Sequence, residues 1–301
     1  TNYTFDNTTS EISESVVHLK SIPLFTNYWA MDETSWGVVE DSIGSGDGTA
    51  TDAVINTNGK IGSAGSFSGS TGSVDYIDFG TGVGAPGASN FSFGAWFKSS
   101  SSGAIIARSY LGGADGRYAL YLNTDGSLRL FQQNGAGDQS FNSTGTGYND
   151  GQWHLAVITI DRYGDTQIHV DETSATGGTV GTSPITQAYN FYIGAYNDGD
   201  GQGTYPDALF YKGLIDEAFY TERALTTAQI NALYNNGQGA RFFTGYSHEK
   251  PYIQAKTAVS FDTILNSFTE TLSQNNKSSA IYQISSDNGT TWKYWSGSAW
   301  T

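Results

Sequence analysis

Two adjacent acids, Asp216 and Glu217, interrupt an otherwise apolar segment, GLIDEAFYT, at residues 213–221. Neighbouring side chains of a strand point to opposite faces, so these two acids cannot form a carboxylate pair with each other. An isolated buried carboxylate is very unfavourable. We therefore expect the acid that faces the core to be paired, and the other to face outward or toward a metal ion.

Calcium is the metal that suits these residues, because it takes hard oxygen ligands from carboxylates, amides and backbone carbonyls. Asp41 lies in a loop, EDSIGSGDG, whose Gly and Ser residues can turn carbonyls inward, and Asp32 is a third candidate ligand. The prediction is a Ca²⁺ site formed by Asp216, Asp41 and Asp32. In the alternative, Asp216 accepts hydrogen bonds from amides near the following helix, or pairs with Arg223 or Lys212.

A second acidic segment, YNDGDGQGTYPD at 196–207, has Asp198, Asp200 and Gln202 at alternate positions. It resembles the first half of a calcium loop, but Leu209 stands where an EF-hand needs its glutamate. One interpretation is a solvated hairpin tip. The other is a sugar site on the rim, where flat aromatic rings lie beside groups that form hydrogen bonds. The predicted ligand-binding residues are Tyr110, Arg117, Asn197, Asp198, Asp200 and Tyr205.

Short β-strands must position these groups. Apolar residues alternate with small or polar ones in NFSFGAWF, GRYALYLNTDGSLRLFQQ, QWHLAVITIDRYGDTQIHVD and YNFYIGAY, which is the period of half-buried strands. Asp125-Gly126 predicts a tight two-residue turn, and Tyr163-Gly164-Asp165 predicts a second reversal. Strands at this spacing, joined by Gly-rich turns, predict an all-β fold of two antiparallel sheets.

One helix is predicted near residues 226–235. Thr226 and Gln229 fit the capping box of a first turn, and Gly237 fits the left-handed position after a last turn. The apolar stripe expected to pack onto the sandwich consists of Ile230, Leu233 and Tyr234. Such a helix could cover a sheet edge or close one end of the core.

Composition excludes several classes of partner. The 14 Lys and Arg residues against 29 Asp and Glu residues give a net charge of −15, which disfavours nucleic acid and anionic membrane surfaces. No run of 18 apolar residues predicts membrane insertion, and residues 1–20 lack the pattern of a signal peptide. The chain has no cysteine. An acidic chain rich in Asn, Ser, Thr and Gly favours a secreted or cell-surface protein, with an ordinary cytosolic domain as the alternative.

The composition also changes near residue 245, where charge and Pro251 return. We expect one sandwich over 22–245. Residues 1–21 and 246–301 are each too short to bury a core, so they are expected to form a small accessory β-domain together. Two separate terminal appendages are the alternative.

Several of these segments, in order, resemble one family. They are YWAMDETSWGVVEDSIGSGDGTA, GKIGSAGSFSGS, FSFGAWFK, GQWHLAVITID and KGLIDEAFYTERALTTAQINALYNNG, and together they are similar to laminin-G-like, concanavalin A-like jelly-roll domains of the pentraxin-like branch. The resemblance covers residues 22–245. It implies two curved antiparallel sheets, a structural calcium between the early loop and the strand of Asp216, and glycan recognition.

The resemblance does not imply a reaction. Glucanases of this fold carry their carboxylates on one strand as E-x-D-x-(x)-E, and no such spacing occurs here. His154 is expected to be structural, and SSDNGTTW at 285–292 matches an Asp-box, which marks a hairpin. The sequence therefore predicts a non-catalytic module that binds carbohydrate or mediates adhesion and that depends on calcium or is stabilised by it. The module would belong to a larger extracellular, bacterial surface protein. Its expected partners are a glycan and neighbouring domains of the same protein. The alternative is an assembly or protein-interaction module that binds no sugar.

Overall fold

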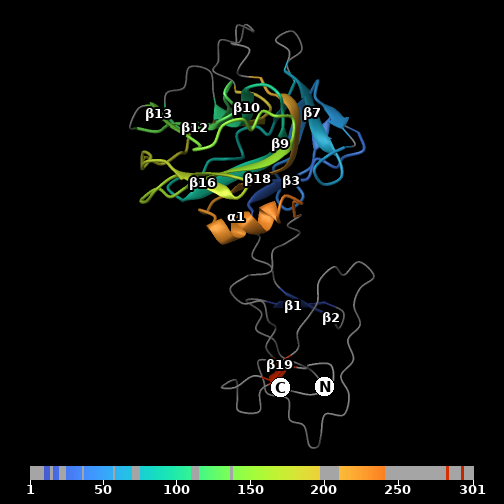
Figure 1. Cartoon of the computed structure of the whole chain (residues 1–301). Helices are drawn as coiled ribbons and strands as arrows, with labels where there is room; N and C mark the ends of the chain where they lie inside the picture. Colours follow the sequence, from blue (N-terminus) through green and yellow to red (C-terminus); the bar gives the residue numbers. More distant parts are fainter. Residues whose placement is uncertain are drawn as a thin grey trace, which may run out of the picture. The chain divides into compact units, whose positions relative to one another are not determined.

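The computed structural model describes residues 10–13, 16–19, 25–35, 37–56, 58–69, 75–109, 115–135, 138–196, 210–240, 283–284 and 293–294 (Figure 1). The chain divides into two units, one of residues 23–245 and the other of residues 1–22 with 246–301. In the second unit the described residues form two short antiparallel pairs, β1 (Ser10–Ser13) with β2 (Val16–Leu19) and β19 (Gln283–Ile284) with β20 (Lys293–Tyr294). The predicted accessory domain stays a prediction, because most of its residues, the Asp-box included, lie outside the described part.

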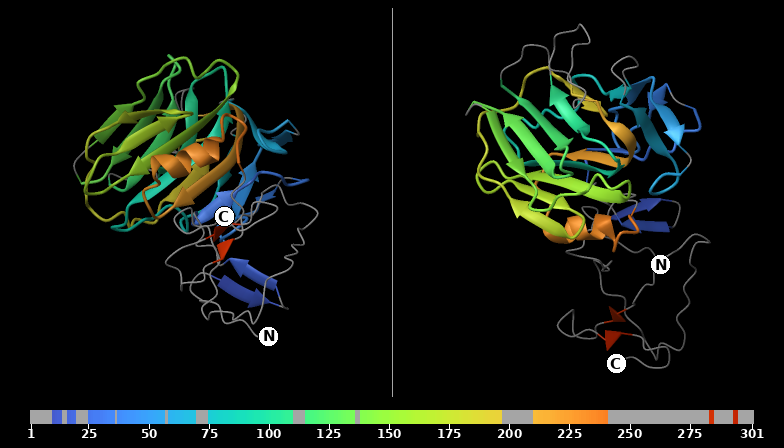
Figure 2. Two further views of the ribbon diagram at one scale, coloured as in Figure 1. Left: turned by 60° about the horizontal axis from the view of Figure 1, so that its bottom comes forward. Right: turned by 45° about the horizontal axis from the view of Figure 1, so that its top comes forward.

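Two antiparallel sheets make up the larger unit. Sheet I has the order β13 (Asp138–Asn142), β12 (Leu128–Gln133), β11 (Arg117–Leu122), β10 (Gly103–Ser109), β17 (Asn190–Ile193), β8 (Tyr76–Asp78), β5 (Gly48–Thr51) and β4 (Val38–Val39). Sheet II has the order β16 (Thr173–Thr176), β15 (Gln167–Val170), β14 (Trp153–Ile160), β9 (Phe91–Lys98), β18 (Lys212–Thr221), β7 (Ala64–Ser68) and β6 (Val54–Asn56), and β3 (Asn27–Trp29) also pairs with β18. The predicted two-sheet sandwich is confirmed (Figures 1 and 2).

The main core lies between the two sheets. The alternation of β11 turns Tyr118, Leu120 and Leu122 inward, where they join Phe91 and Phe93 of β9 in one buried cluster. The Tyr118 ring lies 5.0 Å from that of Phe91 and 4.8 Å from that of Phe93, measured between centroids. Large aromatic rings therefore fill the space between the sheets, as the aromatic-rich strands predict.

The helix α1 (Thr227–Tyr234) lies against the outer face of sheet II (Figure 2). The predicted capping box is present, with the Gln229 amide donating to the Thr226 hydroxyl and the Thr226 amide donating to the Gln229 side chain at 2.8 Å. Ile230 and Leu233 are buried, and the Tyr234 ring stacks on Trp96 with centroids 5.7 Å apart. The helix thus covers a sheet face and not an edge.

The left-handed turn that ends the helix begins earlier than predicted. Asn235 is the C-cap with φ 48°, and Asn236 and Gly237 also have positive φ. Asparagine tolerates this conformation, so the helix stops before the glycine is reached. The Lys60 ammonium donates to the Gly237 carbonyl. The end of the helix is therefore tied to the segment that precedes β7.

Among the described residues, no helix is long and apolar enough to cross a membrane.

The turn between β11 and β12 also differs from the prediction. The Asn123 amide donates to the Ser127 carbonyl at 2.8 Å, so residues 124–126 form a three-residue loop, with Gly126 at φ 77°. Asp125 closes it by accepting from the Ser127 amide at 2.9 Å and the Ser127 hydroxyl at 2.7 Å. The turn is therefore one residue longer than predicted, and the side chain of Asp125 bonds across it.

Candidate functional site

The outer face of sheet I presents a strip of arginine and aromatic side chains. Outward positions of β11 alternate with the core positions, and β12 pairs with β11 so that Arg117 faces Gln133, Ala119 faces Phe131 and Tyr121 faces Arg129. Ala119, Tyr121 and Phe131 belong to an apolar cluster separate from the main core. We call the following set the outer strip: Arg117, Ala119, Tyr121, Arg129, Phe131 and Gln133.

Both guanidinium groups of the outer strip lie over aromatic rings. Arg129 lies 4.7 Å from the centre of the Tyr121 ring, and Arg117 lies 5.9 Å from that of Phe131. The Nε group of Arg117 also donates to the Gln133 Oε1 atom at 2.9 Å. Tyr196 contacts the strip from the side, with its ring 5.6 Å from Tyr121 and edge-on to Phe131. These contacts fix the orientation of the charged groups.

A cavity of about 390 Å³ opens at one end of the outer strip, a volume within the usual range of small-ligand sites. The loop between β11 and β12 forms one wall. Hydrogen bonding from Ser127 lowers the pKa of Asp125, so its carboxylate is ionised at neutral pH. The cavity therefore combines one flat ring with donors and acceptors of both signs, and its lining includes Ser102, Tyr121, Asn123, Thr124, Asp125 and Arg129.

Of the residues predicted to bind a ligand, Arg117 lies in the outer strip. The other five, Tyr110, Asn197, Asp198, Asp200 and Tyr205, lie outside the described residues. Sequence reasoning missed Tyr121, Arg129 and Phe131. A signal was available, because Arg117 and Tyr121 share one parity on their strand and Arg129 and Phe131 share one parity on the next.

The Asp41 carboxylate is surrounded by five N–H donors. Its two oxygens accept from the Asn27 side chain at 2.6 Å, from the Tyr28 amide at 3.0 Å, and from the amides of Ile43, Gly44 and Gly46 at 3.2, 3.0 and 3.0 Å. A Cβ atom on Gly44 would collide with this carboxylate, so the loop needs glycine to close around it. Donors on all sides suit an anion and do not fit a cation. Asp41 therefore orders its own loop.

Asp216 and Asp32 meet on one turn, residues 59–63. The amide of Ile61 donates to Asp216 Oδ2 at 3.0 Å, and the amide of Ser63 donates to Asp32 Oδ1 at 2.8 Å. Burial raises the pKa of Asp216 to about 7, and the negative charge of Asp32 adds to the rise, while hydrogen bonds from backbone amides oppose it. The structure thus brings two of the three predicted metal ligands to the same segment.

Asp216 and Glu217 do not follow the expected alternation. Asp216 faces Trp96 of β9, and Phe219 faces Gly94, so β18 has one extra residue between these pairs. Glu217 takes a φ of 51° at this bulge, and both acids are buried. The prediction that the two side chains point to opposite faces assumed a regular strand and does not apply here. The Asp216 carboxylate accepts from the backbone amides of the turn at 60–61 and, at 2.8 Å, from the Glu217 amide. These amides are not at the start of the helix, where the alternative interpretation placed them.

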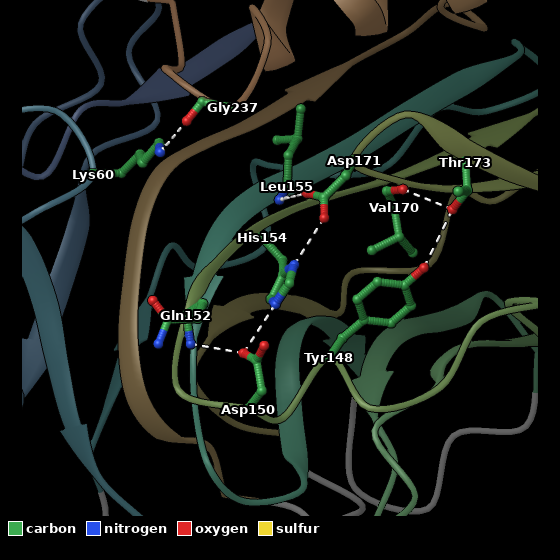
Figure 3. Close-up of polar contacts among 10 residues, drawn as sticks. All are labelled: Lys60, Tyr148, Asp150, Gln152, His154, Leu155, Val170, Asp171, Thr173 and Gly237. Atoms are coloured by element: carbon green, nitrogen blue, oxygen red, sulfur yellow. Dashed lines mark hydrogen bonds and ion pairs between the residues drawn. The ribbon is translucent and has the colours of Figure 1, made fainter.

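His154 forms a second polar cluster at the start of β14 (Figure 3). Its Nδ1 atom lies 2.8 Å from Asp171 Oδ2 and its Nε2 atom 3.1 Å from Asp150 Oδ1. Asp171 also accepts from the Leu155 amide at 2.9 Å. Burial lowers the pKa of His154, but the bonds to Asp171 and Asp150 outweigh it, and the net pKa is raised.

This cluster has the geometry of a structural link. The hydroxyl of Tyr148, whose ring lies edge-on to His154 at 5.1 Å, is 3.3 Å from the hydroxyl of Thr173, and that hydroxyl donates to the Val170 carbonyl at 2.8 Å. Within the described residues no Ser or Thr hydroxyl bonds the imidazole, so the nucleophile of a hydrolase triad is missing from it. The imidazole ring joins β14 to the turn between β15 and β16. In the same part of the chain no group of three or more His, Cys, Asp or Glu side chains gathers to bind a metal.

Comparisons with known proteins add the following. The sequence matches the model of the concanavalin A-like lectin/glucanases superfamily over residues 71–231, more than half of the chain. No protein with a curated description matches it.

Three solved structures illustrate the structural likeness. Domain 4 of AbnA, a GH43 extracellular arabinanase from Geobacillus stearothermophilus, in complex with arabinotriose, has 20% identity and a TM-score of 0.51, covering 69% of this chain and 96% of that domain. The binding domain of botulinum neurotoxin serotype G has 15% identity and a TM-score of 0.52, covering 71% of this chain and 51% of that one. The binding domain of Paraclostridial Mosquitocidal Protein 1 has 11% identity and a TM-score of 0.50, covering 71% and 52%. The chain thus spans about half the length of the two toxin domains, and at these identities the likeness shows the fold alone.

Proposed function

The chain belongs to the concanavalin A-like lectin/glucanases superfamily, and we propose that it acts as a non-catalytic carbohydrate-binding module whose ligand lies on the outer strip. The observation that carries this proposal is the cavity of about 390 Å³ beside the stacked pair of Arg129 and Tyr121. Sugars present an apolar C–H face and a ring of hydroxyl groups. An aromatic ring takes the first, and fixed donors and acceptors take the second.

The geometry supports a sugar over a protein partner. Exposed large hydrophobic side chains among the described residues are Val38, at 55% exposure, and Tyr163, at 82%, and they do not form a continuous apolar patch. A continuous exposed apolar patch is one mark of a protein-docking surface. The outer strip instead mixes half-buried Phe131 with polar groups held at fixed positions. The arabinanase domain in complex with arabinotriose supports the same proposal, since a sugar is bound there by a chain of this fold.

Binding without catalysis is part of this proposal. Hydrolysis of a glycosidic bond needs two carboxyl groups on opposite sides of it, about 5 to 10 Å apart. Among the described residues that line the cavity, Asp125 is the one acid. His154 is engaged by Asp150 and Asp171 in a structural link. The described residues around the cavity therefore offer recognition and lack the acid pair.

Calcium is also proposed, at a narrower site than the sequence suggested. Asp32 and Asp216 are the remaining candidates, because both carboxylates bond the turn at 59–63 and a cation there would offset their like charges. Both oxygens of Asp216 also accept from backbone amides, so a Ca²⁺ ion would have to share the carboxylate with those donors. Asp41 does not fit, since N–H donors occupy its oxygens. Bound there, the ion would join β18 to the turn before β7. Its effect on sugar binding would be indirect, through the stability of the fold.

The extracellular setting and the adhesion role complete the proposal. An acidic chain rich in Asn, Ser, Thr and Gly supports them, as does the extracellular arabinanase among the structural neighbours. Neighbouring domains of the same surface protein would then be further partners of this module.

The test is a glycan array followed by isothermal titration of the sugars that bind. Phe131→Ala should weaken binding at least about tenfold, because it removes the half-buried aromatic ring on which a sugar would pack. Tyr163→Ala is the matched control, an exposed aromatic on the hairpin between β14 and β15 of the other sheet. Equal affinities of the two variants, or an array without any bound sugar, would contradict the proposal.

A further inference from the structure

Arg129 makes no hydrogen bond and no ion pair within the described part of the chain. Its Nε–H group is buried and lacks an acceptor, and its guanidinium contacts the Tyr121 ring at 4.7 Å. A buried donor without an acceptor destabilises the unliganded protein. Its position beside the cavity suggests that the acceptor is a ligand.

The absence of a carboxylate partner is notable in a chain with 29 Asp and Glu residues and 14 Lys and Arg residues. Asp125 lines the same cavity, but its Oδ1 atom accepts from the amide and hydroxyl of Ser127, and no ion pair forms between Asp125 and Arg129. Arg117, the other cation of the outer strip, is bonded to the neutral amide of Gln133. Both positive charges of the strip are therefore left without an anion from the described residues.

We propose that the outer strip selects a glycan that carries carboxylate groups, that is, an oligosaccharide of uronic acids, with one carboxylate bound by Arg129. This inference rests on the proposed function and names the substrate class of the same site. A guanidinium presents a planar fork of N–H donors that matches the two oxygens of a carboxylate. The Tyr121 ring fixes the plane of that fork in advance, which lowers the entropy lost on binding.

The spacing of the two arginines favours an oligosaccharide over a single sugar. Arg129 faces Tyr121, and Tyr121 lies four positions from Arg117 on β11. At 3.3 Å per residue the two arginines are therefore about 13 Å apart along the strand direction. Phe131 lies between them on the same face. A chain of sugars lying along β12 can therefore place one carboxylate at Arg129, a ring on Phe131 and a later carboxylate near Arg117.

The charge of the whole protein makes this selection a local effect. At a net charge of −15, an anionic sugar is repelled at long range, so general attraction does not favour it. Discrimination must then come from contact with the arginine. Replacement of Arg129 is expected to remove most of the preference for the acid, and replacement of Arg223, an exposed arginine outside the strip, is expected to leave it unchanged.

The experiment is isothermal titration with trigalacturonic acid and with its trimethyl ester, a neutral ligand of nearly the same shape. Wild-type protein should bind the acid about 10–100 times more tightly than the ester, the range expected of hydrogen bonds between charged groups. Arg129→Gln should lose most of this preference, and only a small remainder is expected from Arg117. Arg223→Gln is the matched control, because it removes one exposed charge away from the strip and should keep the full preference.

Equal binding of acid and ester by wild-type protein would overturn the inference, as would equal loss in the two glutamine variants. Arg129→Lys gives a second check if Arg129→Gln folds poorly, since it keeps the charge and loses the planar fork, and should fall between wild type and Arg129→Gln. A trisaccharide that carries sulfate groups in place of the carboxylates is a further probe. If it binds as tightly as trigalacturonic acid, the choice of a carboxylate is contradicted. If a neutral sugar binds and Phe131→Ala abolishes that binding while the acid gains nothing, this inference fails and the proposed function survives. If no sugar of any kind binds, both fail.

Discussion

Leu233 is the residue through which docking of α1 can be tested most clearly. It is 5% exposed and belongs to a buried cluster with Ile230, Val157 and Phe219, between the helix and the outer face of sheet II. Leu233→Ala removes buried methyl groups and leaves a gap that the short helix can close in part by shifting. The expected loss in the free energy of unfolding is about 3 kcal/mol, within the 2–5 kcal/mol range of such changes.

The assay is urea denaturation of the whole chain, monitored by tryptophan fluorescence. The slope of the unfolding free energy against urea concentration is held at one value for all variants. A loss of about 3 kcal/mol also lowers the melting temperature of a unit of this size by about 6–12 °C. Asn231→Ala is the matched control, an exposed position of the same helix where the change should stay within about 0.5 kcal/mol. A Leu233→Ala variant as stable as the control would refute the assignment of α1 to the core.

The remaining predictions concern charge. His154→Gln should destabilise the fold most at low pH. The raised pKa of His154 gives stability that is complete below the ordinary value of about 6.5 and is lost as pH rises through the folded pKa. A difference in unfolding free energy from wild type that stays constant between pH 5.5 and 8.5 would contradict the pairing with Asp150 and Asp171. Calcium at a hundredfold excess over its Kd should stabilise the fold by about 2.7 kcal/mol, measured as a fall in melting temperature when EDTA is added. Asp216→Asn should remove that response, whereas Asp41→Asn should keep it while lowering stability in both conditions, and an unchanged response in Asp216→Asn would exclude Asp216 as a ligand.

Local patterns predicted the elements well where the signals lie close together in the sequence. The alternation in β9, β11 and β14 identified those strands, and Thr226 with Gln229 identified the start of α1. The bulge at Glu217 could not be found in this way. The bulge depends on how β18 pairs with β9. No residue type in the segment 216–219 marks which position is the extra one.

The candidate site shows why register matters. A two-residue turn at Asp125-Gly126 would pair Thr124 with Ser127 and place Arg117 opposite Asn134. The observed loop is one residue longer, so Arg117 faces Gln133 and the outward positions of β12 become those of Arg129 and Phe131. A slip of one residue exchanges the two faces of a strand. The sequence analysis named Arg117 as a candidate, and which β12 residues lie beside it depends on the length of the turn.

Asp41 illustrates a different limit. Its residue type and its Gly-rich loop led to the prediction of a Ca²⁺ ligand, and the structure shows a buried carboxylate that bonds the amides of that loop. Whether such a loop directs carbonyls or amides toward the acid depends on the dihedral angles of each residue, and here the amides point inward. The same composition is compatible with a cation site and with an acid that bonds its own loop, and the two differ only in conformation.

A crystal structure of the protein with a bound oligosaccharide tests the central claim most directly. The account predicts a sugar ring packed on Phe131, within the contact distance of about 4.0–4.5 Å, and a polar group of the next sugar in the cavity beside Arg129. A sugar bound elsewhere on the molecule, with the outer strip and its cavity free of ligand, would contradict it.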